Sequence, residues 1–482
     1  MNSNPSNPII QWMFRAMLTC MLAPAAGLHA QRLQPSDFTY LGAFRLPAVT
    51  TDYPATWDWA GQAMTYYPGG DSSGGGDGYP GSLFATGIDT ENWVCELTIP
   101  APSLSRDIGA LPAATVIQPF ADVSGGLFAG YNEQPRVGME YLPAASGRPE
   151  AHLYLTWGQH FQFDPGVNIL PTHAWCGLDL DHPGTRGPWW VGTQAENYAG
   201  LSYRTNDYLF AIPDAWAGAH TGGRSLATGR FKDGGLSGLG PNLLAVGPWL
   251  EGNPPAPGAE LSYTALIAYS FFTDPEGHRM DGCNLADAWT GGAWITAGGA
   301  SAIVFAGTKG SGYSWYGYQT PDGVASPPLY PEGAPCIYEF EIQCNQPDGI
   351  TPCTEADMAP CAGFPDEGNK GWWASRFDAG LLLYDPADLA AVAAGAMEAW
   401  EPQPYGFLDI DAHLFLNATQ ADVIMDNGKG GQRKNRLGSP AYDRDRGLLY
   451  IQEIFADESR PVVHVWRVEP GESRHTRPLE RP

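Results

Sequence analysis

The segment Gly292-Ala-Trp-Ile-Thr-Ala297 is followed, after four residues, by Ala302-Ile-Val-Phe-Ala-Gly307, and this pair decides the fold prediction. A short continuous apolar run between turn residues is typical of a strand buried on both faces. The same pattern recurs at 61–67 with 82–87, at 138–142 with 153–158 and at 438–443 with 448–452, with further copies at 207–210 and 235–247. Such repetition predicts a β-propeller, in which each unit forms one blade.

The composition favours the same all-β fold. The 482 residues include 60 Gly and 43 Pro, and 12% are aromatic. Gly and Pro break helices and form tight turns, whereas aromatic rings suit pleated strands. We predict a β-propeller with loop insertions and one peripheral helix at 386–400, and two β-sandwich domains are the structural alternative. The strands at 37–46 and 462–468 are expected to share a blade and close the ring.

The two ends of the chain differ in composition from the segment between them. Residues 1–30 are typical of a secretory signal, because Arg15 precedes the largely apolar stretch 16–28 and Leu28-His-Ala30 resembles a cleavage site. We predict one propeller domain over 31–470 and a polar C-terminal tail over 471–482. The expected product is a secreted or periplasmic monomer that contacts no membrane once the signal is removed.

The charge balance excludes some partners. Asp and Glu number 52 against 26 Lys and Arg, giving a net charge of −26. Nucleic-acid binding is excluded, because it needs Lys and Arg surfaces. An anionic substrate would need a local group of cations, and residues before inner strands line the mouth of a propeller. The candidate substrate-binding residues are Arg136, Trp157, Arg230, Lys309 and Arg436, and simple pairing with the plentiful carboxylates is the alternative.

Cysteines gather in a segment that has few other means of stabilisation. Cys336, Cys344, Cys353 and Cys361 lie among Pro, Gly and Asp residues within 335–370. In an exported protein this predicts a loop insertion held by at least one disulfide.

Two structural metals are considered, and no organic cofactor is expected. The first is zinc on His278, Cys283 and Cys336. A Cys283–Cys336 disulfide is the alternative use of those two thiols. The second is calcium on the Asp- and Gly-rich loop 69–77.

Part of the chain resembles a known family of enzymes. Five segments carry this resemblance: Asn206-Asp-Tyr-Leu-Phe-Ala-Ile-Pro213, 222–230, 233–241, Trp157-Gly-Gln-His160 and the closing 447–451. Together they resemble the ulvan-lyase type of propeller polysaccharide lyases. The resemblance covers about 100 residues well. It implies seven blades, cleavage of a sulfated, uronate-containing polysaccharide by β-elimination and a bound structural metal. The copies in the sequence fit five to seven blades.

The resemblance also implies catalytic residues. Tyr208 matches the family's catalytic Tyr, Arg224 the Arg that neutralises the substrate carboxylate, and His160 one of two His residues, with His173 as the nearest candidate for the second. Neutralising the carboxylate makes the C5 proton removable by a base, and an acid protonates the departing oxygen. We expect His160, Tyr208 and Arg224 to converge in one cleft.

Two other functions fit the same sequence. A propeller glycoside hydrolase would need paired carboxylates, and Asp58, Glu140, Asp207 and Asp287 lie on or near predicted inner segments. A non-catalytic carbohydrate-binding propeller would use some of the 17 Trp residues to stack on sugars.

Overall fold

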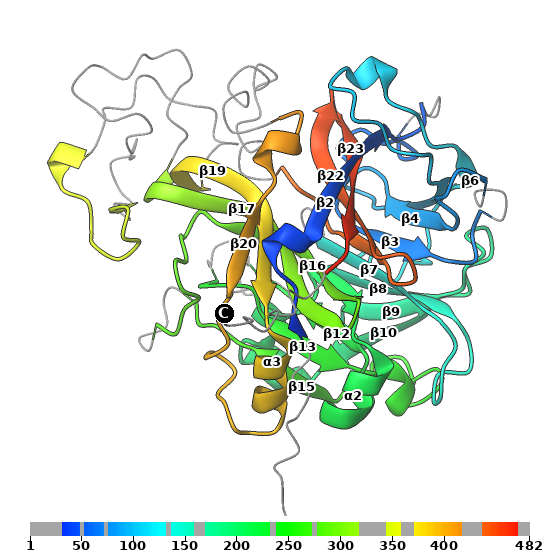
Figure 1. Cartoon of the computed structure of the whole chain (residues 1–482). Helices are drawn as coiled ribbons and strands as arrows, with labels where there is room; N and C mark the ends of the chain where they lie inside the picture. The colour runs from blue at the N-terminus through cyan, green and yellow to red at the C-terminus, as the bar shows by residue number, and fades with distance from the viewer. Residues whose placement is uncertain are drawn as a thin grey trace, which may run out of the picture.

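Five small β-sheets arranged in a ring make this protein a five-bladed β-propeller (Figure 1). The computed structural model describes residues 31–48, 53–71, 76–131, 136–158, 169–231, 238–271, 277–317, 344–357, 371–416 and 436–470. The predicted signal over 1–30 and tail over 471–482 lie outside these ranges. No helix within them is long and apolar enough to cross a membrane.

Each blade is a meander of four antiparallel strands. Blade 1 consists of β3 (Met64–Tyr67), β4 (Ser82–Thr86), β5 (Val94–Thr98) and β6 (Val116–Ala121). Blade 2 consists of β7 (Arg136–Leu142), β8 (His152–Gly158), β9 (His173–Cys176) and β10 (Arg186–Val191), with β14 (Glu260–Leu261) added parallel to β10. Blade 3 consists of β11 (Tyr208–Ala211), β12 (Leu226–Gly229), β13 (Leu243–Val246) and β15 (Tyr263–Ile267).

The last two blades contain the longest strands and the closure of the ring. Blade 4 consists of β16 (Ala288–Ala297), β17 (Ala300–Gly317), β19 (Gly371–Tyr384) and β20 (Gly406–Asp409), with β1 (Gln31–Arg32) and β18 (Cys344–Asn345) paired to β17. Blade 5 consists of β21 (Ala441–Asp443), β22 (Leu448–Asp457), β23 (Arg460–Val468) and β2 (Phe38–Arg45). The N-terminal β2 pairs with the C-terminal β23, so the predicted closure is confirmed.

The expectation of seven blades is wrong. The inner strands β3, β7, β11, β16 and β21 each contact the inner strands of both neighbouring blades, which completes a ring of five. The sequence copies at 207–210 and 235–247 are not separate units, because they contribute β11 and β13 to blade 3 alone. A four-strand blade can therefore contain two apolar hairpins that look like two repeats.

Glycines let the inner strands approach closely. A Cβ added to Gly138 of β7 would lie 2.6 Å from backbone atoms of Tyr208 and Leu209 in β11. One added to Gly438 would lie 1.9 Å from the carbonyl oxygen of Gly61. Backbone therefore packs against backbone near the axis, which suits the small circumference of five strands.

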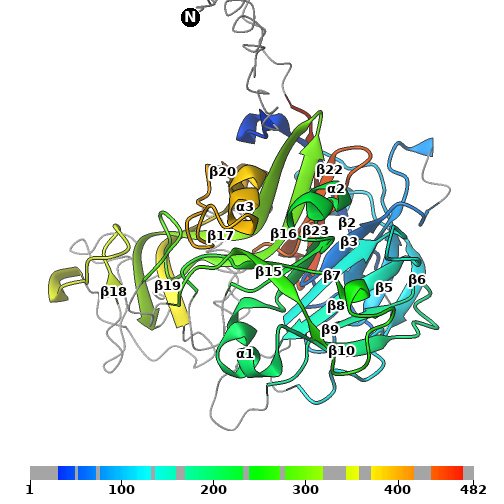
Figure 2. The ribbon, with the colours of Figure 1, turned by 90° about the horizontal axis from the view of Figure 1, so that it is seen from below.

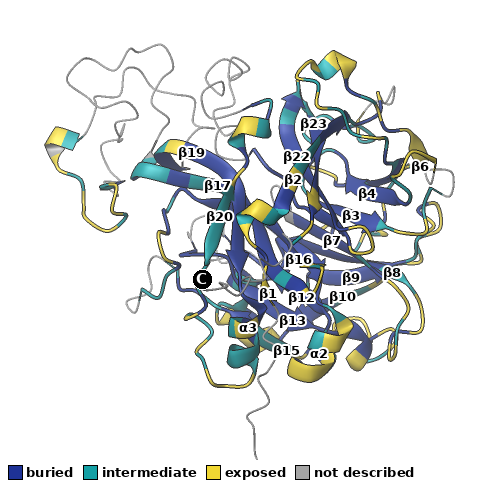
Figure 3. Ribbon diagram, viewed as in Figure 1, coloured by how far each residue is buried: buried dark blue, intermediate teal, exposed yellow. Residues whose placement is uncertain are grey.

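The hydrophobic core is divided among the five spaces between blades. Each space holds its own cluster of buried side chains drawn from two neighbouring blades, as Tyr208 and Phe210 of blade 3 pack with Trp294 and Phe305 of blade 4. Figure 3 shows the strands as predominantly buried, with exposed residues gathered on loops and short helices. Blade-to-blade packing thus stabilises the ring.

Three short α-helices lie at the periphery of the described part of the chain. They are α1 (Gln194–Tyr198), α2 (Asp214–His220) and α3 (Pro386–Ala393). The helix predicted from residue 386 is confirmed at its start, where the Asp385 carboxylate caps the backbone N–H of Ala387 at 2.9 Å. It ends at Ala393 rather than near residue 400, and Gly395 follows with a φ of +70°.

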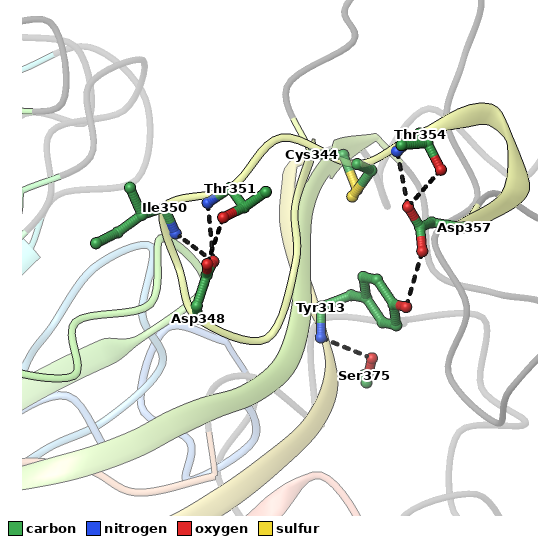
Figure 4. The surroundings of a disulfide bond; sticks show 9 residues. Tyr313, Cys344, Asp348, Ile350, Thr351, Thr354, Asp357 and Ser375 are labelled. Atoms are coloured by element: carbon green, nitrogen blue, oxygen red, sulfur yellow. Dashed lines mark hydrogen bonds between the residues drawn. A yellow bond between two sulfur atoms is a disulfide. The ribbon is translucent and has the colours of Figure 1, made fainter.

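A ribbon formed by the far halves of β17 and β19 extends away from the ring and carries β18 beyond it (Figure 2). A disulfide joins Cys344 to Cys353 there, which confirms the prediction of a disulfide in this segment. Tyr313 of the ribbon donates a 3.0 Å hydrogen bond to Asp357, which fastens the disulfide loop to the ribbon (Figure 4). Cys336 and Cys361 lie outside the described residues.

Candidate functional site at one face of the ring

One face of the propeller collects most of the residues predicted to bind substrate. We call it the start face, because the inner strands begin there. Arg136 begins β7, Arg230 directly follows β12, Lys309 lies in β17 level with the start of β16, and Arg436 precedes β21. Basic residues of four consecutive blades therefore lie in backbone segments at the same face.

Two of these cations are held by an arrangement that blades 3 and 4 share. Asp207 directly precedes β11 and faces Arg230, with Nε 3.5 Å from Oδ1. Asp287 directly precedes β16 and faces Lys309, with Nζ 2.9 Å from Oδ1. Each carboxylate also accepts the backbone N–H of the residue after its cation, at 3.3 and 2.8 Å. Each pair joins the residue before an inner strand to the neighbouring part of the blade's second strand or the residue after it.

Lys309 is less buried than Arg230 and Arg436. The side chains of Arg230 and Arg436 are at most 1% exposed, whereas that of Lys309 is 21% exposed. Arg436 binds the Asp411 carboxylate and donates to the carbonyl oxygens of Leu416 and Phe377 at 2.8 and 2.5 Å. We infer that Arg230 and Arg436 stabilise the start face, because a buried arginine with several acceptors is fully used.

A buried polar network lies between blades 2 and 3 at this face. His173 makes a 2.9 Å hydrogen bond from Nε2 to the Thr228 hydroxyl, which also accepts the backbone N–H of Asn206 at 3.3 Å. Arg230 donates to Oδ1 of Asn206 at 3.0 Å. Burial lowers the pKa of His173 to about 3, so its imidazole is neutral. His173 and Arg230, selected from the sequence, thus belong to one network.

Tyr208 adjoins this network inside the protein. Its side chain is fully buried, and its hydroxyl donates a 2.5 Å hydrogen bond to the carbonyl oxygen of Asn242. Burial raises the pKa of Tyr208 well above its ordinary value. A sugar ring cannot reach that hydroxyl in this structure, and Trp157 is likewise stacked in the core on Phe128, with ring centroids 4.4 Å apart.

Arg224 does not meet Tyr208. It precedes β12 at the opposite face and donates to the Thr221 carbonyl at 2.8 Å and to the Ser262 hydroxyl at 2.8 Å. In the β11–β12 hairpin, Tyr208 pairs with Gly229, whereas the end near Arg224 pairs with the other end of β11. The expected convergence of Tyr208 and Arg224 in one cleft is therefore contradicted, and His160 lies outside the described residues.

The carboxylates of the hydrolase alternative do not gather either. Asp207 and Asp287 are bound to their cations, and Asp58 accepts a 2.5 Å hydrogen bond from Ser459. Glu140 lies toward the opposite face, where it accepts the N–H of Ala211 at the end of β11 at 3.1 Å. These contacts do not bring any two of the four carboxylates to one site where a sugar could bind.

The residues proposed for zinc lie in different surroundings. The His278 ring is stacked on Trp400 with centroids 4.0 Å apart and an interplanar angle of 2°, and Cys283 is buried in the core between blades 3 and 4. Cys336 is outside the described residues. Within the described ranges no three His, Cys, Asp or Glu side chains form a group that could hold a metal. Zinc, and calcium on the partly described loop 69–77, remain predictions without structural support.

A crevice that the sequence did not reveal opens beside Lys309. Its volume is about 360 Å³, within the range of small-molecule sites. It is lined by Lys309, Leu382, Asp281 and the consecutive residues 404–407. These residues come from β17, β19, the connection into β16 and the start of β20, so no sequence spacing could have indicated the group.

Comparisons with known proteins identify no family for this chain, so only its fold defines its class. The chain matches no protein-family model, and no curated protein matches it in sequence. The structure defines a five-bladed propeller with a cation-bearing start face and an adjacent crevice.

Proposed function

We propose that this protein is a secreted polysaccharide lyase that cleaves an anionic, uronate-containing polymer by β-elimination. The observation that carries the proposal is that basic residues of four consecutive blades lie at the start face of a chain whose net charge is −26. Arg230, Lys309 and Arg436 are each paired with a carboxylate there, so Arg136 is the cation that we propose for the substrate. A cation on an acidic protein gives a local attraction for the carboxylates of such a polymer.

The reaction needs three tasks at that face. A cation neutralises the uronate carboxylate, a base takes the C5 proton, and an acid protonates the C4 oxygen as its bond to the sugar breaks. We assign neutralisation to Arg136, since Arg230 and Arg436 are fully used inside the protein. His160 remains the proposed base, because in the sequence it lies two residues after Gly158, where β8 ends at the start face.

The first experiment identifies the reaction from its product. Purified protein incubated with ulvan and other polyuronates should produce an unsaturated uronate that absorbs ultraviolet light. New reducing ends without that absorbance would identify a hydrolase. Binding of the polymer without either product would identify a carbohydrate-binding propeller.

The second experiment compares cations at the two faces. Arg136→Gln should lower kcat/KM for the acidic polymer at least tenfold, because the developing enolate loses its neutralising charge. Arg224→Gln is the matched control and should leave kcat/KM unchanged, because Arg224 is bound at the opposite face. Loss of activity in Arg224→Gln alone would overturn the assignment of the start face.

A further inference from the structure

We propose that the crevice beside Lys309 in blade 4 binds one neutral pyranose unit, and that this unit belongs to the polymer whose cleavage is proposed above. The crevice-forming residues are Lys309, Asp281, Leu382 and residues 404–407. This inference rests on the proposed function only for the source of the sugar. The binding itself follows from the groups that line the crevice.

The crevice offers one hydrogen-bond donor that is held in place. Lys309 donates to Asp287 and to the Gly310 carbonyl, both at 2.9 Å. An ammonium group has three N–H donors, so one remains on a side chain that is 21% exposed and lines the crevice. Because Asp287 fixes the ammonium, little conformational entropy is lost when a ligand accepts this third hydrogen.

Asp281 supplies the matching acceptor. It is exposed, and its backbone N–H donates to the amide oxygen of Gln403 at 2.7 Å. Gln403 in turn donates to the carbonyl of Arg279 at 3.2 Å, which fastens the connection before β16 to the segment before β20. A carboxylate accepts hydrogen bonds from hydroxyl groups, and neighbouring hydroxyls of a sugar can donate to Asp281 and accept from Lys309.

The floor of the crevice suits the C–H face of a sugar ring. Phe407 lies over Gly380, and a Cβ at residue 380 would be 2.4 Å from the Phe407 ring. This glycine therefore lets the aromatic ring pack closely on β19. Leu382 extends the apolar surface. An aromatic floor with a few fixed polar groups is typical of small-molecule sites.

Charge decides between a neutral and an acidic sugar. The positive charge of Lys309 is balanced by the fully buried Asp287, and Asp281 adds one negative charge. The lining is thus net negative. A uronate carboxylate would be repelled, whereas a neutral pyranose gains both hydrogen bonds without that cost.

Binding to the full chain tests the inference. Glucose, galactose and rhamnose are the neutral probes, and glucuronic acid is the charged counterpart of glucose, with binding followed by saturation-transfer NMR and calorimetry. At least one neutral sugar should bind with a Kd on the order of 1 mM, a weak affinity that one small crevice can supply. Glucuronic acid should bind at least tenfold more weakly than glucose. No binding of any neutral sugar, or stronger binding of glucuronic acid, overturns the inference.

Variants locate the binding in the crevice. Asp281→Ala and Phe407→Ala should each weaken binding at least tenfold, because one removes the acceptor and the other the stacking surface. Asp179→Ala, at an exposed carboxylate in the connection between β9 and β10, is the matched control and should leave the Kd unchanged. If both crevice variants bind like the wild type while remaining folded, the sugar is bound elsewhere and the inference fails.

The two proposals fail separately. Sugar binding without unsaturated product would retain the crevice and reject the lyase. Unsaturated product without neutral-sugar binding would support the proposed lyase activity and overturn the proposed sugar site in the crevice.

Discussion

Glu140 shows how a single residue can join several blades. Its carboxylate accepts the Thr65 hydroxyl at 2.9 Å and the Ala211 N–H at 3.1 Å, and it lies 3.3 Å from an Arg444 nitrogen. These partners belong to blade 1, blade 3 and the turn after β21. Glu140, which the sequence suggested as a carboxylate for hydrolysis, thus connects inner strands of neighbouring blades near the axis.

The protonation of Glu140 should make the free energy of unfolding depend on pH. Burial raises its pKa from the ordinary 4.5, and Arg444 only partly offsets this. Between 4.5 and the raised value the folded chain holds more protons than the unfolded chain, so the free energy of unfolding decreases as pH rises. Glu140→Gln should remove this contribution.

Urea unfolding from pH 4.5 to pH 8 provides the measurement. The difference in unfolding free energy between wild type and Glu140→Gln should change with pH across that window. Glu398→Gln, at an exposed side chain, should run parallel to the wild type. Parallel curves for Glu140→Gln as well would show that its pKa is the same in both states.

At the scale of elements, the β17–β19 ribbon differs from the other hairpins. Its far half leaves the ring and packs Trp315, Trp372, Trp373 and Phe377 in a separate cluster with Cys344. The disulfide closes a sequence separation of only 9 residues within this extension. Its stabilisation should therefore be local.

Replacing both Cys344 and Cys353 with Ser tests this. Loss of the short cross-link should loosen the loop by about 2–3 kcal/mol and speed amide hydrogen exchange over 344–357. The Tm of the ring should stay within about 2 °C, because none of the five inter-blade clusters contains either residue. Reduced wild-type protein should behave in the same way. A cooperative fall in Tm would show that the ribbon supports the ring.

At the scale of the whole molecule, stability depends on closing the ring between β2 and β23. Gly42 lies at an irregularity in this pairing with a φ of +127°, and a Cβ there would be 2.5 Å from the Ser103 backbone. Ala43 and Ser103 exchange two backbone hydrogen bonds of 2.9 Å beside it. A side chain at residue 42 would push β2 away from this contact.

Gly42→Ala should lower the free energy of unfolding by about 2 kcal/mol or more, through backbone strain and the clash with Ser103. Denaturant unfolding gives the value. Gly218→Ala is the control, since no heavy atom lies within 4 Å of the added Cβ and the site is in α2. It should be neutral or stabilising by up to about 1 kcal/mol. Equal stability of the two variants would show that β2 does not limit the stability of the ring.

The sequence by itself determined the all-β propeller class, the pairing of the first and last strands, the start of α3 and the presence of a disulfide between 335 and 370. These depend on local patterns: continuous apolar runs, turn residues, a capping Asp and cysteine density. The same patterns put Arg136, Arg230 and Arg436 next to the ends of strands, because strand direction follows from the order of hairpins, whereas Lys309 lies in the middle of β17.

Only the tertiary structure decided the number of blades, the burial of Tyr208, the separation of Arg224 from it and the crevice beside Lys309. The blade count depends on which hairpins pair with each other, and one blade can contain two similar hairpins. The other three depend on how elements distant in the sequence pack together. Asp281 and Phe407 line the same crevice as Lys309, and no periodicity in the sequence encodes that arrangement, because it depends on how the connection before β16 and the strands β17, β19 and β20 pack together.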